Sequence, residues 1–283
     1  MEASVERLIE AALAEDIGPG DLTAAYFVPA ERRATGFIVA REAGVLSGGE
    51  VALEVFRRVD PEIEALPLVA DGARISAGAY VMRLEGSARS LLTAERTALN
   101  FMQRMSGVAS ATWSYVDAVR GTSARILDTR KTIPGWRLLD KAAVVHGGGT
   151  NHRMGLYDRV MVKDNHLVAE GRLDELREAI RRLKADHPEV EVELEADRLE
   201  QVAAFLELED VDHLLLDNMD NGELRQAVAL RGDRKGPLLE ASGGVTLDTV
   251  AAIAATGVDF ISVGAITHSV KALDLALDFT GRE

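Results

Sequence analysis

The strongest constraint on the fold of this 283-residue chain is a repeating pattern in its second half. Short apolar runs recur there, the later ones roughly every 22 to 24 residues, and helical patterns fill the gaps between them. Strands that alternate with helices at this spacing predict parallel βαβ units. The predicted strands are Arg125–Leu127, Val160–Val162, Val190–Leu194, His213–Leu216, Leu238–Leu239 and Phe260–Val263. The predicted helices among them are Leu173–Lys184, Leu199–Leu208, Gly222–Ala229 and Leu247–Ala255.

The residues that end these apolar runs favour a barrel over an open sheet. In an open doubly wound sheet the chemistry concentrates at one switch point, whereas a barrel brings every strand end to one mouth. Six visible strands are fewer than the eight of a closed barrel, so we expect an incomplete α/β barrel. The runs finish on charged residues or glycine, at Asp128, Lys163, Glu195, Asp217, Glu240 and Gly264.

The first part of the chain has a different pattern. A helical stretch at Val5–Ala14 is followed by strand-like runs at Gly36–Arg41 and Tyr80–Glu85, which are separated by glycine turns and predict an α+β arrangement. Residues 90–119 are helical in period but are interrupted near Ser106-Gly107, so two helices in series are expected. We therefore predict an N-terminal α+β domain over residues 1–107, completed by 269–283, and an α/β barrel catalytic domain over 108–268.

The composition excludes several classes of function. A net charge of −14 argues against nucleic acid as a partner, because phosphate backbones require a broad basic face. No apolar run is long enough to cross a membrane, and the N-terminus has the pattern of an acidic amphipathic helix rather than a signal peptide. With no cysteine in the chain, disulfides and thiolate chemistry are also excluded. We expect a cytoplasmic enzyme or binding protein.

Positive charge gathers in one window of this acidic chain. Residues 120–163 hold nine Lys or Arg against three Asp or Glu, a local charge of +6 that leaves −20 for the rest. Such gathering predicts a pocket for a small, highly charged anion. Arg130, Lys131, Arg153 and Lys163 lie at or just after predicted strand ends, so we expect them to converge. The alternative, a solvated ion-paired surface, would need more acids among them.

Other residues in the window carry weaker signals. His152 belongs to an Asn-His-Arg sequence and is either a ligand of the anion or a satisfied polar residue. Gly147–Gly149 predicts a mobile or anion-cradling loop. Lys163 at a barrel strand end could instead form a Schiff base with a carbonyl substrate.

Two glycine loops near the end of the chain predict phosphate sites. Ser242-Gly243 and Gly264 each follow an apolar run and precede a helix, so backbone N–H groups there can approach an anion closely. The alternative is that these glycines only make tight turns. Loops after the last strands of a barrel are a common phosphate position, which favours the phosphate interpretation.

Glu195 and Asp217 end consecutive strands and should face the same mouth. Acids beside phosphate loops commonly hold Mg²⁺, which prefers oxygen ligands and bridges to substrate phosphates. They could equally accept hydrogen bonds from ribose hydroxyls, or pair with basic neighbours.

The motifs together resemble those of the quinolinate phosphoribosyltransferases of NAD biosynthesis. The resemblance covers nearly the whole chain, since EDIGPGDLT, LLTAERTALNFMQRMSGVA, DTRKTIPG, GGGTNHRMGL, VKDNH, LLLDNM, EASGGV and SVGAITHS occur in the family's order. It implies an incomplete, seven-stranded α/β barrel with an N-terminal α+β sandwich domain. It also implies transfer of phosphoribosyl from 5-phosphoribosyl-1-pyrophosphate (PRPP) to quinolinate with decarboxylation, giving nicotinate mononucleotide, CO₂ and pyrophosphate.

The resemblance also implies roles for single residues in a homodimer with shared active sites. Arg96 would enter the neighbouring subunit's site and, with Arg130, His152 and Arg153, would grip the two quinolinate carboxylates. Lys131 and Lys163 would meet the charges of PRPP. Glu195 and Asp217 would bind the ribose hydroxyls directly or through Mg²⁺. The 5′-phosphate pocket would be lined by Ser242, Gly243, Gly264 and His268.

The chain departs from the family pattern at four positions. We expect Thr, Leu, Tyr and Arg where this chain has Ile133, Trp136, Ala142 and Val145. These departures bear on the acid substrate and on the packing of the triple glycine. The alternatives are therefore a paralogous phosphoribosyltransferase of the molybdate-operon type with another acid, a Lys163 Schiff-base enzyme, or a non-enzymatic anion-binding protein.

Overall fold

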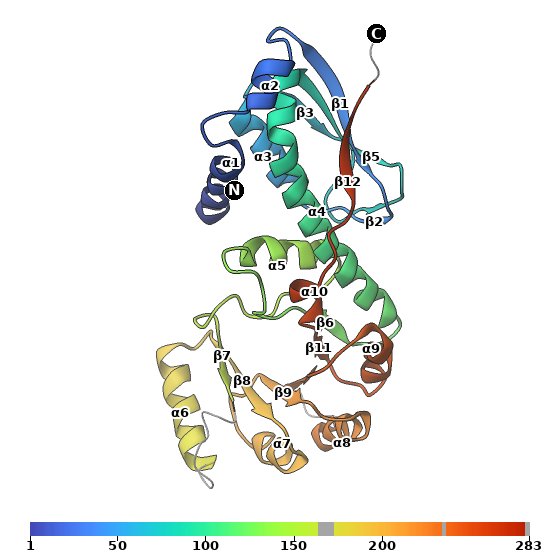
Figure 1. Ribbon diagram of the computed structural model, residues 1–283. Helices are drawn as coiled ribbons and strands as arrows, with labels where there is room; N and C mark the ends of the chain where they lie inside the picture. Colours follow the sequence, from blue (N-terminus) through green and yellow to red (C-terminus); the bar gives the residue numbers. More distant parts are fainter. Residues whose placement is uncertain (164–172, 234–235, 281–283) are drawn as a thin grey trace. The chain divides into compact units, whose positions relative to one another are not determined.

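The computed structural model describes residues 1–163, 173–233 and 236–280, which form two compact units (Figure 1). The first unit comprises Met1–Trp113, Thr132–Gly148 and Ser269–Glu283, and the second comprises Ser114–Lys131 and Gly149–His268. The segment 132–148, placed by the sequence in the barrel domain, belongs to the first unit. The predicted domain bounds themselves stay a prediction.

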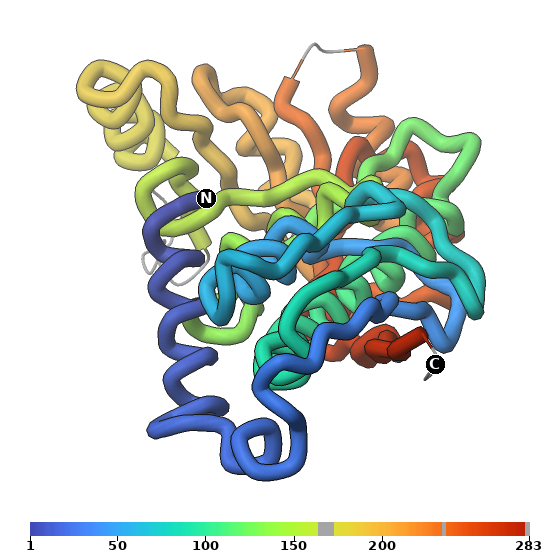
Figure 2. Tube along the Cα trace, turned by 90° about the horizontal axis from the view of Figure 1, so that it is seen from above, coloured from blue at the N-terminus to red at the C-terminus, as the bar shows by residue number. Residues whose placement is uncertain are grey.

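The first unit is built on an antiparallel sheet of four strands. Its order is β12 (Leu275–Phe279), β1 (Arg33–Ala40), β5 (Tyr80–Ser87) and β3 (Glu64–Pro67). The C-terminal strand β12 pairs with β1, far from it in sequence, as the red and blue segments show (Figure 2). A two-stranded ribbon joins β2 (Gly44–Val45) to β4 (Arg74–Ile75). The helices are α1 (Ala3–Ile17), α2 (Leu22–Phe27), α3 (Gly49–Val59), α5 (Arg137–His146) and most of α4 (Ala88–Ala118).

Helix α4 corrects one prediction, because residues 88–118 form one continuous helix and the expected break near Ser106-Gly107 is wrong. The two small residues serve close packing. A Cβ atom on Gly107 would lie 2.3 Å from the carbonyl oxygen of Lys271. Ser106 Oγ accepts a hydrogen bond from the backbone N–H of Ser47 (2.9 Å) and donates one to its carbonyl oxygen (3.0 Å). A single glycine within a helix is tolerated, and here close packing against two other segments accounts for the small residues.

The second unit is the predicted α/β barrel, which the structure confirms as incomplete. Six parallel strands lie in the order β6 (Arg125–Leu127), β11 (Phe260–Ser262), β10 (Leu238–Ser242), β9 (His213–Asp217), β8 (Glu191–Ala196) and β7 (Arg159–Val162). Beyond β6, a single parallel bridge joins Leu127 to Thr150, in place of a full seventh strand among the described residues. The intervening helices are α6 (Leu173–Asp186), α7 (Leu199–Phe205), α8 (Asn221–Arg231), α9 (Leu247–Ala254) and α10 (Ala265–His268) (Figure 1).

Alternation along the strands separates the apolar core from the interior of the barrel. On β8, Val192 and Leu194 are fully buried, whereas Glu193 and Glu195 point to the other face. Register places Glu195 beside Leu215 of β9, and Leu215 beside Glu240 of β10. The helix-facing side of the sheet is therefore apolar, and its concave side carries the ionisable residues.

No helix among the described residues has both the length and the apolar character that crossing a membrane would require.

Candidate active site

A pocket of about 540 Å³ opens at the carboxyl ends of the parallel strands, entirely within the second unit. It is bounded by the loop after β6, the ends of β7 to β10, and the turn after β10. Strand ends meet there because all six strands run in the same direction. Nine of the twelve predicted site residues line this pocket: Arg130, Lys131, His152, Arg153, Lys163, Glu195, Asp217, Ser242 and Gly243.

The other three predicted residues lie outside the pocket lining. Arg96 is exposed on α4 in the first unit. Gly264 lies beside the pocket, where a Cβ atom would stand 3.3 Å from Cδ of Lys131 and 3.0 Å from Nε2 of His268. His268 ends α10, and the hydroxyl of Thr267 before it donates to the carbonyl oxygen of Lys131 (2.9 Å). Gly264 and His268 are thus close to a predicted phosphate ligand.

The pocket brings cations and carboxylates together on neighbouring strand ends. Lys163 follows β7, and its Nζ donates to Oε2 of Glu195 on β8 at 2.5 Å. Asp217 ends β9, where one of its oxygens accepts from the Asn218 amide (2.7 Å). The side chain of Lys163 is thus engaged by a carboxylate of the neighbouring strand. Residues Asp164 to His166 of the VKDNH sequence lie outside the described residues.

Burial and like charge act on one arginine of this group. The pKa of Arg153 is lowered, first by burial and then by the positive charge of Arg130. Its guanidinium donates to the carbonyl oxygen of Arg159 (3.1 Å) and approaches the sulfur of Met161 (3.6 Å). Two guanidinium groups that repel each other across an open pocket are suited to an anionic ligand between them.

The turn after β10 exposes backbone rather than side chains to the pocket. Gly243 and Gly244 have positive φ values of 99° and 58°, a conformation that favours glycine. A Cβ atom on Gly243 would lie 2.1 Å from Oδ1 of Asn218, so a side chain cannot fit. The loop leads into α9, which begins after Thr246. Close approach of the backbone to an anion is possible here.

The triple glycine has a different place from the one expected. Gly147 and Gly148 belong to the first unit, and none of the three glycines lines the pocket. A Cβ atom on Gly147 would lie 2.4 Å from the carbonyl oxygen of Ala109 and 2.6 Å from Cβ of Thr112. The residue therefore serves close packing against α4, and the anion-cradling interpretation is wrong for it.

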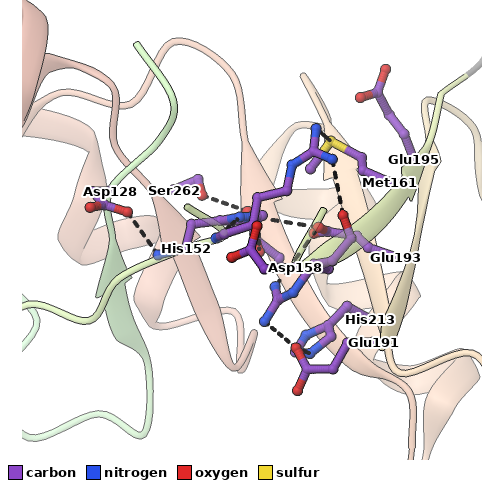
Figure 3. Close-up of polar contacts among 12 residues, drawn as sticks. Asp128, His152, Asp158, Met161, Glu191, Glu193, Glu195, His213 and Ser262 are labelled. Atoms are coloured by element: carbon purple, nitrogen blue, oxygen red, sulfur yellow. Dashed lines mark hydrogen bonds and ion pairs between the residues drawn. The ribbon is translucent and has the colours of Figure 1, made fainter. Parts of the chain in front are cut away.

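The floor of the pocket contains two acids that the sequence analysis did not choose as site residues. Glu193 and Glu240 are fully buried on β8 and β10, and an oxygen of each faces Nε2 of His152. Figure 3 shows the contact of Glu193 with His152. Glu240 is the third of the five residues of β10 rather than its end, but it lines the pocket together with Ser242. The signal that could have found Glu193 is its place two residues before Glu195, on the same face of a strand.

His152 lies between these acids and Asp128 (Figure 3). Its backbone N–H donates to Oδ1 of Asp128 at 2.7 Å, and its Nε2 lies 3.1 Å from Glu193 and 3.5 Å from Glu240. Burial opposes protonation of His152, and the two carboxylates favour a proton on Nε2, the nitrogen that faces them. Burial, followed by the charge of Glu240, raises the pKa of Glu193.

The four departures from the family pattern all lie in the first unit and outside the pocket lining. Ile133 and Val145 are exposed, and Ala142 is half-buried. Trp136 stacks on Phe101 with ring centroids 5.1 Å apart.

Comparison with known proteins gives matches along nearly the whole chain. Residues 21–106 match the family described as quinolinate phosphoribosyl transferase, N-terminal domain, and residues 108–278 match its C-terminal domain. The chain is 47% identical over 275 residues to the nicotinate-nucleotide pyrophosphorylase (carboxylating) of Mycobacterium leprae (strain TN), covering 95% of each chain. It is 42% identical to the chloroplastic enzyme of that name from Arabidopsis thaliana, over 96% of this chain and 82% of the relative.

Solved structures agree with the sequence matches. The nicotinate-nucleotide pyrophosphorylase of Francisella tularensis superposes with a TM-score of 0.91 at 40% identity, over 98% of this chain and 96% of that one.

Proposed function

This chain belongs to the quinolinate phosphoribosyl transferase family, and we propose that its pocket carries out the reaction of that family. The enzyme is a pentosyltransferase of NAD biosynthesis that converts PRPP and quinolinate to nicotinate mononucleotide, CO₂ and pyrophosphate. The observation that carries the assignment to this pocket is its charge pattern. Arg130, Lys131, Arg153 and Lys163 all line it, while Glu195 and Asp217 stand on adjacent strand ends.

The charge of the substrates matches this pattern. PRPP and quinolinate together bring roughly seven negative charges into one cleft. Cations spread over the surface could not balance this charge, whereas cations gathered in the cleft can. Four cations converge within a pocket of about 540 Å³, in a chain whose net charge is −14. The pocket is thus suited to hold both anions at once.

Quinolinate is assigned to the arginine side of the pocket. Arg130 and Arg153 would each bind a carboxylate through a two-pronged guanidinium contact. His152 would lie beneath them at the pocket floor, and Arg96 of a second subunit would complete the site. The mutual repulsion of Arg130 and Arg153 supports this assignment, because a dianion between them relieves it.

PRPP is assigned to the lysine side and the glycine loops. Lys131 and Lys163 would neutralise pyrophosphate oxygens as point charges. Ser242 and the backbone of Gly243 would bind the 5′-phosphate, with Gly264 and His268 next to Lys131. The position of the Gly243-Gly244 turn before α9 supports this side for the phosphate.

Glu195 and Asp217 fit a Mg²⁺ ion that accompanies PRPP. Both are carboxylates that line the same pocket and lie on neighbouring strands, and oxygen donors are the ligands that Mg²⁺ prefers. When bound, the ion would withdraw charge from the departing pyrophosphate. The same acids could accept hydrogen bonds from the ribose hydroxyls.

The residues of the pocket mainly hold and orient the reactants. The pyridine nitrogen forms a bond to C1 of the ribose while the bond from C1 to pyrophosphate breaks. The carboxylate next to the ring nitrogen then leaves as CO₂; its electron pair stays on the ring carbon, and a proton from solvent replaces it. Holding the nitrogen in line with the leaving group is the largest contribution that fixed arginines can make. Lys131 and Lys163 stabilise the charge that develops on pyrophosphate.

Incubation with PRPP, Mg²⁺ and quinolinate, with detection of nicotinate mononucleotide and CO₂, tests the function. We expect one CO₂ for each mononucleotide formed. Turnover of a different acid without turnover of quinolinate would assign the chain to a paralogous activity instead. Trapping of a carbonyl substrate on Lys163 by borohydride would favour the Schiff-base alternative.

We also propose a homodimer in which Arg96 enters the partner's pocket. Arg96 is exposed on α4 and takes no part in the pocket lining of its own chain. A cytoplasmic location is proposed on the composition of the chain alone.

A further inference from the structure

At the floor of the pocket lies a cluster of buried polar side chains, of which His152, Glu240 and Ser262 line the pocket and Glu193 lies behind them, and its two acids have no part in the reaction described above. Glu193 and Glu240 are 0% exposed, His152 is 8% exposed and Ser262 is 7% exposed. The four residues come from β8, β10, β11 and the segment after the single bridge at Thr150. They meet because parallel strands of one sheet place them on the same face.

Both nitrogens of the His152 ring face groups within the protein. Nδ1 accepts a hydrogen bond from the backbone N–H of Arg153 at 2.6 Å. Nε2 therefore carries the ring proton, and it faces Oε2 of Glu193 at 3.1 Å and Oε2 of Glu240 at 3.5 Å. A ring held in this way presents no free nitrogen to a substrate carboxylate, so His152 acts on the substrate through its neighbours.

The nearest such neighbour is Arg153. Its backbone N–H is bound to the ring, and its guanidinium reaches the carbonyl oxygen of Arg159 and the sulfur of Met161 on β7. Met161 is in register with Glu193 on the adjacent strand β8. Glu193, which faces the His152 ring, thus lies on the strand next to β7, and the guanidinium of Arg153 contacts β7.

Two buried carboxylates at this place are unfavourable unless they serve a purpose. Oε2 of Glu193 and Oε2 of Glu240 both face Nε2 of His152, and Oε2 of Glu193 also lies 3.8 Å from the guanidinium of Arg159. Oε1 of Glu240 accepts a hydrogen bond from Ser262 at 2.5 Å, and Oε1 of Glu193 has no donor among the described residues. Burying acids with so few donors costs free energy that apolar residues of similar size would not. A role in orienting the ring accounts for them.

We propose that Glu193 and Glu240 are positioning residues for the acid substrate: they fix the imidazole of His152 and, through it, hold Arg153 where a substrate carboxylate binds. The inference rests on the proposed function for the identity of that substrate. The orientation of the His152 ring does not depend on the proposed function, and it can be measured without turnover.

Steady-state kinetics test the effect on the substrate. In Glu193→Gln and in Glu240→Gln we expect the KM for quinolinate to rise by about tenfold, with the KM for PRPP changed by less than about twofold. Glu191→Gln is the matched control, because Glu191 lies on the same strand but pairs with Arg159 and His213 away from the pocket lining. An equal rise for both substrates, or the same rise in the control, would overturn the proposal.

A double-mutant comparison separates positioning from general loosening of the structure. If the acids act through the ring, Glu240→Gln should have little further effect on the quinolinate KM once His152→Asn is present. Additive effects would show that Glu240 acts by another route. Ser262→Ala, which removes only the hydroxyl that donates to Glu240, should shift the same KM in the same direction by a smaller factor, and covers the case in which the acid variants fail to fold.

Ring resonances of the histidines give the readout that needs no substrate. The chain has six histidines, so the His152 signals can be assigned by their loss in His152→Asn. In wild type we expect a single ring form with the proton on Nε2, and altered or averaged signals in both Glu→Gln variants. Unchanged signals in both would refute the proposal. Failure of wild type to use quinolinate, with the ring signals as expected, would refute the proposed function alone.

His152, Glu193 and Glu240 also have the spacing of a metal site, since their ligand atoms lie within 4.8 Å of one another. Elemental analysis of the purified enzyme therefore belongs to the test. A stoichiometric metal ion whose removal changes the His152 signals would replace the positioning role by metal binding.

Discussion

At the scale of single residues, the place of an acid on strand β8 decides whether its side chain reaches the pocket. Glu193 and Glu195 share the concave face of β8, while Val192 and Leu194 are buried on the other. The residue nearer the strand end reaches the open pocket and pairs with Lys163. The residue two positions earlier is enclosed and faces His152. Two positions along the same face thus separate Glu195, which lines the pocket, from Glu193, which is fully enclosed.

Arg130→Ala is predicted to weaken quinolinate binding far more than PRPP binding. Loss of a charged contact to a carboxylate should cost on the order of 2 kcal/mol, which corresponds to a rise of about thirtyfold in the quinolinate KM. The measurement is a pair of KM values, with Arg120→Ala as the control, because Arg120 is exposed and paired with Asp117. Equal losses for the two substrates would contradict the role given to Arg130.

At the scale of elements, glycines mark places where segments approach closely. Gly107 within α4 lies against the chain at Lys271, and Gly147 after α5 lies against α4 at Ala109. In sequence the first suggests a helix break and the second a mobile loop. In the structure both are contacts between an element and the backbone of another.

Gly147→Ala is predicted to destabilise the enzyme by about 2 to 3 kcal/mol, because the added Cβ overlaps the backbone of α4. Thermal or urea unfolding measures the loss. The control is Gly236→Ala, where a Cβ atom would meet nothing within 4 Å and the backbone is not left-handed. A Gly147 variant as stable as the control would mean that the segment relaxes away from α4.

Ion pairs tie helices α1 and α3 of the first unit together. Arg58 on α3 reaches Glu10 (2.6 Å) and Glu6 (3.9 Å) on α1, and Glu54 accepts from both Arg57 and Arg58. The hydrogen bond from Arg57, helped by Arg58 and opposed by burial, lowers the pKa of Glu54 from 4.5 to about 2.

A carboxylate whose folded-state pKa is depressed stabilises the fold above its unfolded pKa, and the contribution is lost as pH falls through the folded-state value. Glu54→Gln should therefore lower the free energy of unfolding by about 1 kcal/mol at pH 7, after allowance for solvent screening. The difference should shrink as pH falls from 4.5 toward 2. Urea unfolding at successive pH values checks this, with the exposed Glu31→Gln as control. A difference that does not depend on pH would remove the ionic explanation.

At the scale of the whole molecule, the cationic window of the sequence divides between the two units. Arg130, Lys131, Arg153 and Lys163 converge on the pocket, whereas Lys141 is buried in the first unit. Because the whole chain carries a net charge of −14, this pocket with its gathered cations is the place where a polyanion binds most favourably.

Mixing two inactive variants tests the proposed sharing of active sites. Arg96→Ala and Lys163→Ala, each inactive alone, should regain activity after their subunits are exchanged, because half of the randomly formed dimers then hold one intact site. The expected recovery is about a quarter of the wild-type activity. If the mixture stays inactive while exchange of subunits is shown by mass, Arg96 does not act across a dimer.

Much of the catalytic unit could be predicted from the sequence. The spacing of apolar runs determined the parallel strands and helices, since each unit repeats a local pattern that does not depend on distant contacts. The convergence of residues at strand ends, such as Glu195 and Asp217, could be predicted because parallel strands all end at the same edge of the sheet. Nine predicted site residues line one pocket there. Strand β6 has the predicted bounds, and the other five strands differ from them by one to three residues at an end, as β8 (Glu191–Ala196) does.

Only the tertiary structure decided the roles that depend on what lies opposite a residue. Gly107 and Gly147 are explained by backbone that is distant in sequence, and Glu193 and Glu240 by an imidazole that comes from another segment. Local pattern determines which face of a strand or helix a residue occupies, because periodicity is a property of the element. The partner on that face is a property of the packed chain, as the placement of His152 against Glu193 and Glu240 shows.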